Sequence, residues 1–284
     1  MRISVFSAQQ FVSPGNLGFS PEKYSRFKYG SKSAAREFGH EMGRKFLQSQ
    51  IYQDLQTNFD LSQVPIIVAS APYKFTPTAS FALKDYFVHE FNKAHALQFG
   101  QSTQEIKIYR AHSYYDDYSS MTKEDRSKAI TSDDFYIDQK FVKGKVLFSV
   151  DDIRITGSHQ DRIEALLKSV NFKGQVVFLF YAELIGKEEP QIETFLNRYA
   201  INNLTDINKI IREDEFTFNT RVVKFILQSN PNDFTTFIQF QSERFNETLL
   251  HYAVGNEYFN DANLSTNLST LRLYLDQQTQ QTIN

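Results

Sequence analysis

Short apolar runs that alternate with helical patterns constrain the fold of this 284-residue chain most strongly. The clearest runs are rich in β-branched and aromatic residues and indicate buried strands: Val64-Pro-Ile-Ile-Val-Ala69, Lys145-Val-Leu-Phe-Ser-Val150 and Gln175-Val-Val-Phe-Leu-Phe-Tyr-Ala182. A further strand is predicted at residues 105–110, and a short one at residues 3–6. Strands that alternate with helices imply parallel pairing through crossovers. The sequence therefore predicts an α/β fold with a doubly wound, mostly parallel sheet.

Helical patterns fill much of the remaining chain. Before residue 190 they are predicted at residues 33–55, 79–99 and 160–170. After Pro190 the strand signals stop, and helices are predicted at residues 191–200, 204–213, 217–229, 232–252 and 266–276. We accordingly divide the chain into an N-terminal segment and helix at residues 1–60, a core at residues 61–189 and a helical C-terminal region at residues 190–284. A hood, meaning a cover over a site in the core, would come from residues 1–60, from residues 190–284 or from both.

Composition excludes several classes of protein. Hydrophobic residues make up 41% of the chain, which is enough for a sizeable core. The net charge of −2 argues against a broad nucleic-acid-binding surface. The absence of cysteine excludes thiolate catalysis and cysteine-ligated metals. No apolar run approaches the roughly 20 residues that span a membrane, and the N-terminus is too polar for a signal peptide, so we expect a cytoplasmic protein without membrane partners.

One segment carries the chemistry, Val146-Leu-Phe-Ser-Val-Asp-Asp-Ile-Arg-Ile-Thr-Gly-Ser-His159. A predicted strand ends directly in Asp151 and Asp152, a tight turn follows, and a helix then begins. Ligands of open α/β sheets bind beyond the carboxyl ends of strands, and the free amides at a helix start suit a phosphate. Gly157 lets the backbone approach such a group closely. Paired acids beside a phosphate cradle indicate a ligand with hydroxyls and a phosphate, such as a phosphorylated ribose.

This segment resembles the motif with which type I phosphoribosyltransferases bind 5-phosphoribosyl-1-pyrophosphate (PRPP). The resemblance implies that Asp151 and Asp152 hold the ribose hydroxyls. It also implies that the 5′-phosphate is held by the turn and helix start, which consist of Ile155, Thr156, Gly157, Ser158 and His159. The family often has Thr at position 155 and Thr or Ser at position 159. Here the isoleucine would offer its backbone amide and the histidine its ring.

The loop after the first core strand resembles the pyrophosphate-binding loop of the same family. It consists of Ala71, Pro72, Tyr73 and Lys74. The resemblance implies that the Lys74 ammonium meets the leaving pyrophosphate. It also implies a cis peptide bond, either between Ala71 and Pro72 or between Tyr73 and Lys74.

A polar stretch at residues 111–140 is similar in spacing to the closing loop of ComF-like phosphoribosyltransferases. This similarity implies that Arg126 contacts the substrate and that Arg110 matches a basic position in that group. Closure of such a loop would exclude water from the reaction. The whole resemblance covers about residues 64–182.

The predicted function is transfer of ribose 5-phosphate from PRPP to an unidentified nitrogenous base or related acceptor, with release of pyrophosphate. The resemblance implies Mg²⁺ held mainly through PRPP, with Asp151 and Asp152 in support. Two other functions stay open, namely a non-catalytic PRPP or nucleotide sensor and a ComF-like interaction protein. A helical layer over Asp151 would favour the enzyme, and an exposed apolar stripe on the C-terminal helices would favour the interaction protein. A homodimer is one option for its assembly.

Several singled-out residues also have plain structural interpretations. The acidic pair could cap a helix, Lys74 could be a surface lysine, and Arg110 could form a salt bridge within a loop. The histidines outside the motif have no metal-ligand spacing and are interpreted as structural.

Overall fold

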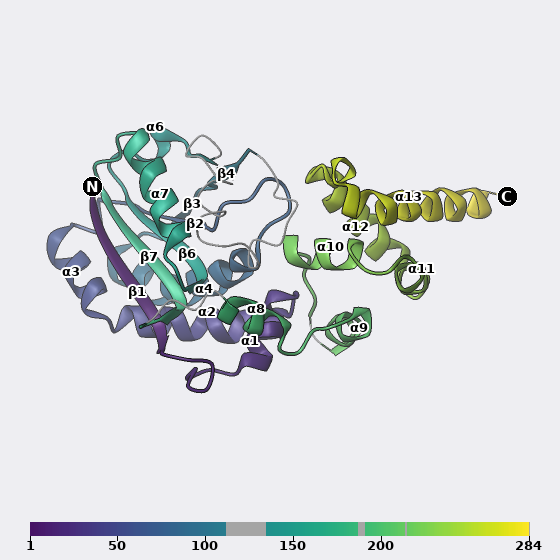
Figure 1. Ribbon diagram of the computed structural model, residues 1–284. Helices are drawn as coiled ribbons and strands as arrows, with labels where there is room; N and C mark the ends of the chain where they lie inside the picture. Colours follow the sequence, from purple (N-terminus) through teal and green to yellow (C-terminus); the bar gives the residue numbers. More distant parts are fainter. Residues whose placement is uncertain (112–134, 187–190, 214, 284) are drawn as a thin grey trace.

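The computed structural model describes residues 1–111, 135–186, 191–213 and 215–283, and the fold is drawn in Figure 1. An α/β part contains the N-terminus, and a helical part contains the C-terminus at the opposite end of the molecule. The α/β part consists of β1 (Arg2–Phe11), α1 (Pro21–Lys28), α2 (Lys32–Leu47), α3 (Gln50–Asn58), β2 (Ile66–Ser70), α4 (Ala79–Phe99), β3 (Gln104–Glu105), β4 (Tyr109–Arg110), β5 (Phe135–Tyr136), α6 (Gln139–Val142), β6 (Val146–Arg154), α7 (Ser158–Ser169), β7 (Gln175–Leu184) and α8 (Gln191–Arg198). The helical part consists of α9 (Leu204–Glu213), α10 (Thr220–Leu227), α11 (Pro231–Gln239), α12 (Glu243–Gly255), the short 3₁₀ helix η3 (Tyr258–Asn260) and α13 (Ala262–Ile283).

Within the described ranges, the main sheet has five strands in the order β1-β7-β6-β2-β3, and each neighbouring pair is parallel. The predicted fold class is therefore confirmed. The chain leaves β2 through α4 toward one edge, and it leaves β6 through α7 toward the other edge. The carboxyl ends of β2 and β6 thus border the point where the direction of winding reverses, which is where open α/β sheets bind ligands.

The two faces of the sheet bury alternate residues of each strand. Ile66 and Val68 of β2 pack into the cluster that contains residues of α2 and α4. Ile67 and Ala69 pack into the opposite cluster, which contains Leu166 and other residues of α7. Figure 1 shows α2 and α4 on one side of the sheet and α7 on the other. Burial on both faces explains why the core strands have continuous apolar sequences.

Residues 1–60, which the sequence separated from the core, belong to the α/β part in the structure. The predicted strand at residues 3–6 extends over Arg2–Phe11, and it pairs with β7 along nearly its whole length. Helix α2 packs along α4. The glycines Gly39 and Gly43 of α2 lie so close to α4 that a Cβ atom at either would overlap it.

Three predicted elements are divided in the structure. The predicted strand at residues 105–110 becomes β3, which pairs with β2, and β4, which turns to pair antiparallel with β5. The predicted helix at residues 33–55 breaks where the Ser49 side chain caps α3, and the one at residues 232–252 breaks where Ser242 caps α12. A serine that accepts a hydrogen bond from a backbone amide favours a new helix start over a continuous helix. No helix in the described part of the chain is long and apolar enough to span a membrane.

Backbone hydrogen bonds fasten the helical part to the α/β part. The Lys32 amide donates to the Glu215 carbonyl at 2.8 Å, and the Thr217 amide donates to the Gly30 carbonyl at 2.9 Å. Gly30 has a φ of 96°, and a Cβ atom there would overlap the Thr217 carbonyl oxygen. This junction therefore requires glycine for both its backbone conformation and its space.

We expect Gly30→Ala to lower the free energy of unfolding by about 2 kcal/mol or more, because it adds backbone strain and a steric overlap at the junction. Gly100→Ala is the matched control, since Gly100 also has a positive φ (70°) but nothing lies within 4 Å of its Cβ position. Urea unfolding of both variants checks the prediction. Equal losses in the two variants would contradict a role for the close contact with Thr217.

Candidate functional site

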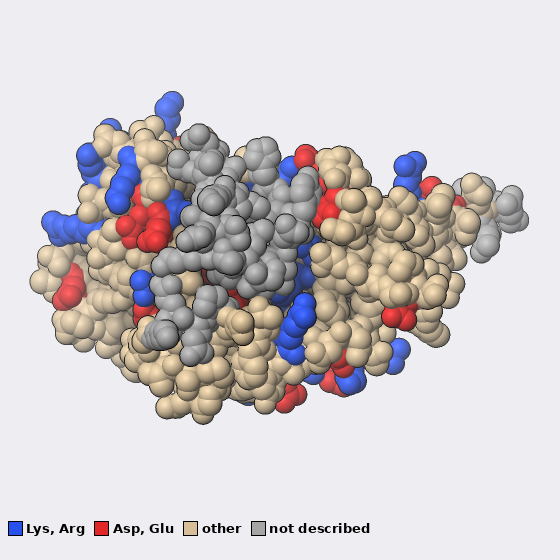
Figure 2. Space-filling view, viewed as in Figure 1, with Lys and Arg blue, Asp and Glu red and all other residues tan. Residues whose placement is uncertain are grey.

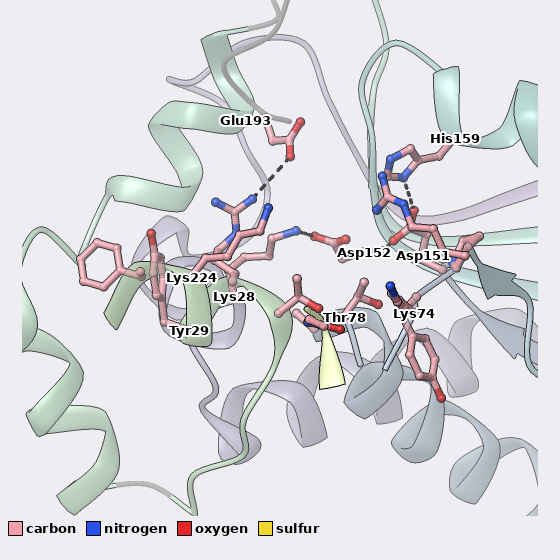
Figure 3. A pocket seen from close by; sticks show the side chains of 18 of the residues that line it. Lys28, Tyr29, Lys74, Thr78, Asp151, Asp152, His159, Glu193 and Lys224 are labelled. Atoms are coloured by element: carbon pink, nitrogen blue, oxygen red, sulfur yellow. Dashed lines mark hydrogen bonds and ion pairs between the residues drawn. The ribbon is translucent and has the colours of Figure 1, made fainter. Parts of the chain in front are cut away.

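A cavity of about 190 Å³ lies between the carboxyl ends of β2 and β6 and the helical part. Figure 3 shows that its lining side chains come from segments far apart in the sequence. They include Lys28 and Tyr29 at the end of α1, the loop after β2, Asp151 and Asp152 of β6, and several side chains of α10. A smaller cavity of about 60 Å³ adjoins it, lined by the same two aspartates and residues 153–160.

The acidic pair lies inside β6, whereas the sequence predicted it at the strand tip. Strand β6 continues to Arg154, and Asp151 is in register with Phe180 of β7. On the other side, β2 ends at Ser70, opposite Val150. Beyond that point β2 no longer flanks β6, and the stretch of β6 that contains Asp151 and Asp152 borders both cavities. Both carboxylates still lie toward the carboxyl end of the sheet, beside the two cavities.

Asp152 is held as a buried anion. Its Oδ2 atom accepts hydrogen bonds from the Tyr24 hydroxyl and from the Lys28 ammonium, the latter at 2.5 Å. Burial alone would raise the pKa of Asp152, but the Lys28 charge and the hydrogen bonds from Asp151 and Tyr24 hold it below its usual value. Burial and the Asp152 charge raise the pKa of the Tyr24 hydroxyl, so Tyr24 remains a hydrogen-bond donor.

Asp151 has the opposite electrostatic situation. Burial raises its pKa, and the neighbouring Asp152 charge adds to this effect, although a 3.1 Å contact with His159 Nδ1 opposes it. The Asp152 amide donates to Asp151 Oδ1 at 2.9 Å, which fixes the carboxyl group. The site therefore combines one firmly ionised carboxylate with one that takes up a proton more readily.

The predicted phosphate turn borders the smaller cavity. Gly157 has a φ of 73° and directly precedes α7. The Thr156 and Ser158 hydroxyls are 2.8 Å apart, and the Ser158 amide donates to Thr156 Oγ1 at 3.4 Å, a long hydrogen bond that a phosphate oxygen could replace. The Arg154 guanidinium donates hydrogen bonds to the Glu183 carboxylate and to the Gln160 side-chain oxygen, which fixes its position beside the turn. The predicted phosphate-binding residues are thus brought together at one helix start, with Ile155 half-buried and His159 largely exposed.

The predicted pyrophosphate loop lines the main cavity with all four of its residues. Lys74 forms a 2.6 Å ion pair with Glu257 of the helical part, and its carbonyl accepts from Lys107. The loop continues into backbone amides of Phe75 and Thr76 that both donate to the Asn256 side chain.

The expected cis peptide bond in this loop is wrong, because no cis peptide occurs in the described part of the chain. The loop is held instead by a bridge between Tyr73 and Tyr109, in which the Arg110 amide donates to the Tyr73 carbonyl at 3.2 Å. Arg110 itself lines the cavity, as predicted for a basic position. Arg126 lies outside the described residues.

Sequence reasoning missed the side chains that the N-terminal segment, α8 and the helical part contribute. They include Tyr24, Lys28, Tyr29, Glu193, Arg221, Lys224 and Phe225. A signal existed only for α10, where Arg221, Lys224, Phe225 and Gln228 follow helical spacing on one side of the helix. Figure 2 shows basic side chains gathered along the junction of the two parts, where the cavity lies.

The chain was compared with models of known protein families. A family model described as "PRTase ComF-like" matches residues 3–271. The chain belongs to the ComF-like phosphoribosyltransferase family. Because the match extends to residue 271, the family pattern of ComF-like phosphoribosyltransferases spans both the α/β part and the helical part. No curated protein matches the chain.

Lys28→Met should lower the free energy of unfolding by about 3–5 kcal/mol at pH 7, because Asp152 would become a buried charge without its partner. In the native protein the Asp152 pKa is lowered, so the stabilisation is present above the pKa of the unfolded chain and is lost as the pH falls through the folded value. In the variant, burial would raise that pKa, and the deficit should shrink as the pH falls toward 4.

Urea unfolding at several pH values measures this difference. Lys23→Met is the matched control, since the Lys23–Glu37 ion pair is exposed and should contribute at most about 1 kcal/mol. A Lys28→Met deficit that does not change with pH would contradict the assigned electrostatics.

Proposed function

We propose that this protein is a Mg²⁺-dependent phosphoribosyltransferase, which transfers ribose 5-phosphate from PRPP to a nitrogen atom of an acceptor and releases pyrophosphate. The observation that carries the proposal is the convergence of the acidic pair, the turn before α7 and the Lys74 loop on adjoining cavities. These are the groups that a ligand with two ribose hydroxyls, a monophosphate and a diphosphate requires. Membership of the ComF-like family supports the same reaction class.

Each part of PRPP has a complementary group in the site. The ribose hydroxyls donate to the Asp151 and Asp152 carboxylates in β6. The 5′-phosphate accepts hydrogen bonds from the turn amides and from the Thr156 and Ser158 hydroxyls, beside the positive end of the α7 dipole. The pyrophosphate lies against Lys74 and Arg110, whose positive charges line the main cavity.

The donor set also suits Mg²⁺ bound together with the ligand. Mg²⁺ commonly uses one or two carboxylates and substrate phosphates. Asp151 and Asp152 are the buried carboxylates of the site, and they would support a metal held mainly by PRPP. When bound, Mg²⁺ supplies positive charge that offsets the charge of the diphosphate.

In the reaction, the bond between ribose C1 and the pyrophosphate oxygen breaks, and its electron pair leaves with the pyrophosphate. The acceptor nitrogen supplies the pair that forms the new C1–N bond, and a proton on that nitrogen passes to solvent or to the departing phosphate. Lys74 and Arg110 stabilise the negative charge that develops on the leaving group. The α10 side chains cover the cavity opposite the acids and limit the access of water.

The position of the helical part supports an enzyme over an interaction protein. Residues of α10 and η3 line the same cavity as Asp151, as a layer over the active site should. A second candidate is a PRPP sensor. It is favoured by the 2.6 Å ion pair between Lys74 and Glu257, because a lysine already held by a carboxylate stabilises less of the charge that develops on a departing pyrophosphate.

Calorimetry with PRPP and Mg²⁺ should detect binding that Asp151→Asn and Asp152→Asn each weaken by about tenfold or more, since each removes a charged acceptor worth roughly 1.5–3 kcal/mol. Urea unfolding identifies any variant that has lost its fold, and the exposed Glu247→Gln serves as the control. Pyrophosphate release is then measured with a panel of nitrogenous bases. Full turnover by Asp152→Asn would refute the proposal, and binding without release by any base would favour the sensor.

Lys74→Gln separates the pyrophosphate contact from the rest of the site. We expect about tenfold weaker binding of PRPP and unchanged binding of ribose 5-phosphate, because only PRPP carries the group that the ammonium contacts. Calorimetry with both ligands measures the difference. Equal loss for the two ligands would mean that Lys74 acts on the fold or on the ribose phosphate, against its assigned role.

A further inference from the structure

We infer that the acceptor is a planar compound that carries an anionic group, and that the cavity-facing side of α10 binds it. This inference rests on the proposed function and specifies the substrate that the sequence left open. Its basis is a part of the cavity wall that the assigned groups of PRPP leave unused, namely the α10 side with the adjacent Tyr29.

Helix α10 has two sides of different chemistry. Val222, Val223, Ile226 and Leu227 are buried in the core of the helical part. The opposite side carries Arg221, Lys224, Phe225 and Gln228, and all four line the cavity. The apolar side fixes the orientation of the helix, so the second side faces the cavity as a consequence of core packing.

Hydrogen bonds place α10 against both segments that contribute to the PRPP site. The Thr220 amide donates to the Pro77 carbonyl at 2.8 Å, and the Thr220 hydroxyl donates to the Thr76 carbonyl at 2.8 Å. The Asn219 side chain donates to the Lys28 carbonyl at 3.1 Å and also caps the helix. The α10 side chains are therefore held on the same rigid frame as the Lys74 loop and Lys28, which suits a site that must position two substrates.

Among the side chains that the structure describes, positive charges predominate at the α10 end of the cavity. Arg221 and Lys224 stand there with one carboxylate, Glu193, which lies 4.0 Å from Arg221 at the outer limit of an ion pair. The charge of Lys28 is offset within the site by buried Asp152, whose Oδ2 lies 2.5 Å from the ammonium. An arginine fork and a lysine ammonium on one helix side, with the Gln228 amide one turn further, match the oxygens of a carboxylate or phosphate.

Aromatic rings adjoin these cations. Tyr29 and Phe225 both line the cavity, and their ring centroids lie 5.0 Å apart at an interplanar angle of 77°. Tyr29 is buried in the core of the helical part, so the partly exposed ring of Phe225, held edge-to-face by Tyr29, supplies the apolar contact on which a flat ring can pack. A flat, apolar contact beside two cations selects for a planar ring with an acidic substituent.

The position of α10 at the other end of the pocket from the phosphate turn argues against a role in holding the 5′-phosphate of PRPP. Figure 3 shows Tyr29 and Lys224 at one end of the pocket and His159 with Asp151 at the other, with Lys28 and Asp152 between them. The 5′-phosphate belongs at the His159 end. A ribose held by Asp152 would then turn its reactive carbon toward the remaining space, where α10 and the Lys74 loop meet.

The test uses pairs of planar heterocycles with the same ring, one with and one without an anionic carboxylate, such as nicotinate with nicotinamide and orotate with uracil, within a library of several hundred small metabolites. Binding is measured by calorimetry or mass spectrometry with Mg²⁺ and PRPP present. Arg221→Gln and Lys224→Gln are compared with Arg272→Gln, a change on exposed α13. We expect hits among anionic planar compounds, and affinity at least about tenfold lower in the two α10 variants than in the control.

The outcomes separate this inference from the proposed function. Failure of the unaltered protein to bind PRPP would overturn the proposed function and this inference with it. PRPP binding with hits that are mainly uncharged, or with no anionic planar compound bound, would overturn the inference alone. A loss of PRPP affinity of more than about fivefold in Arg221→Gln or Lys224→Gln would also overturn it, since it would assign those cations to PRPP.

Discussion

The buried ion pair between Lys28 and Asp152 organises this molecule. It joins the end of α1 to the edge of β6, two segments that are 124 residues apart in the chain. A charge in this environment requires its partner, because an unpaired buried ion costs several kcal/mol. The Lys28 carbonyl in turn accepts from Asn219 at the start of α10. The sheet, the N-terminal segment and the helical part therefore meet at one electrostatic contact beside the cavity.

The parallel sheet and the acidic pair could be predicted because their signals are local. Ile66–Ser70 has a continuous apolar sequence, and the strand-acid-acid-turn pattern around Asp151 needs only neighbouring residues. Strand β1 was harder, since Ser4, Ser7 and Gln9 give an edge strand a half-polar sequence. The role of Lys28 had no local signal, because its partner is distant in sequence. The spacing of apolar residues in α10 distinguishes an apolar from a polar side of the helix, but it does not reveal that the polar side faces a cavity.

The position of the helical part bears on which segments would recognise the acceptor. The sequence left both the N-terminal segment and the C-terminal region as sources of a hood, and in the structure the N-terminal segment forms one edge of the sheet and contributes Tyr24, Lys28 and Tyr29. Most of the wall opposite the acids comes from α10 and η3. In this family member, the segments that would recognise the acceptor and those that would bind PRPP thus have separate positions in the chain and a shared cavity.

The contacts of Asn256 and Glu257 have a consequence for how a ligand enters and leaves the cavity. Asn256 accepts from two amides of the segment that follows Lys74, and Glu257 holds the lysine itself. Because these three contacts join residues 74–76 to the helical part, this loop cannot move away from the cavity independently. A ligand therefore has to pass through the open part of the cavity rim, or the α/β part and the helical part have to move apart as rigid bodies. Separation of the two parts would have to break these three contacts, so their combined strength sets the free-energy cost of opening the cavity in that way.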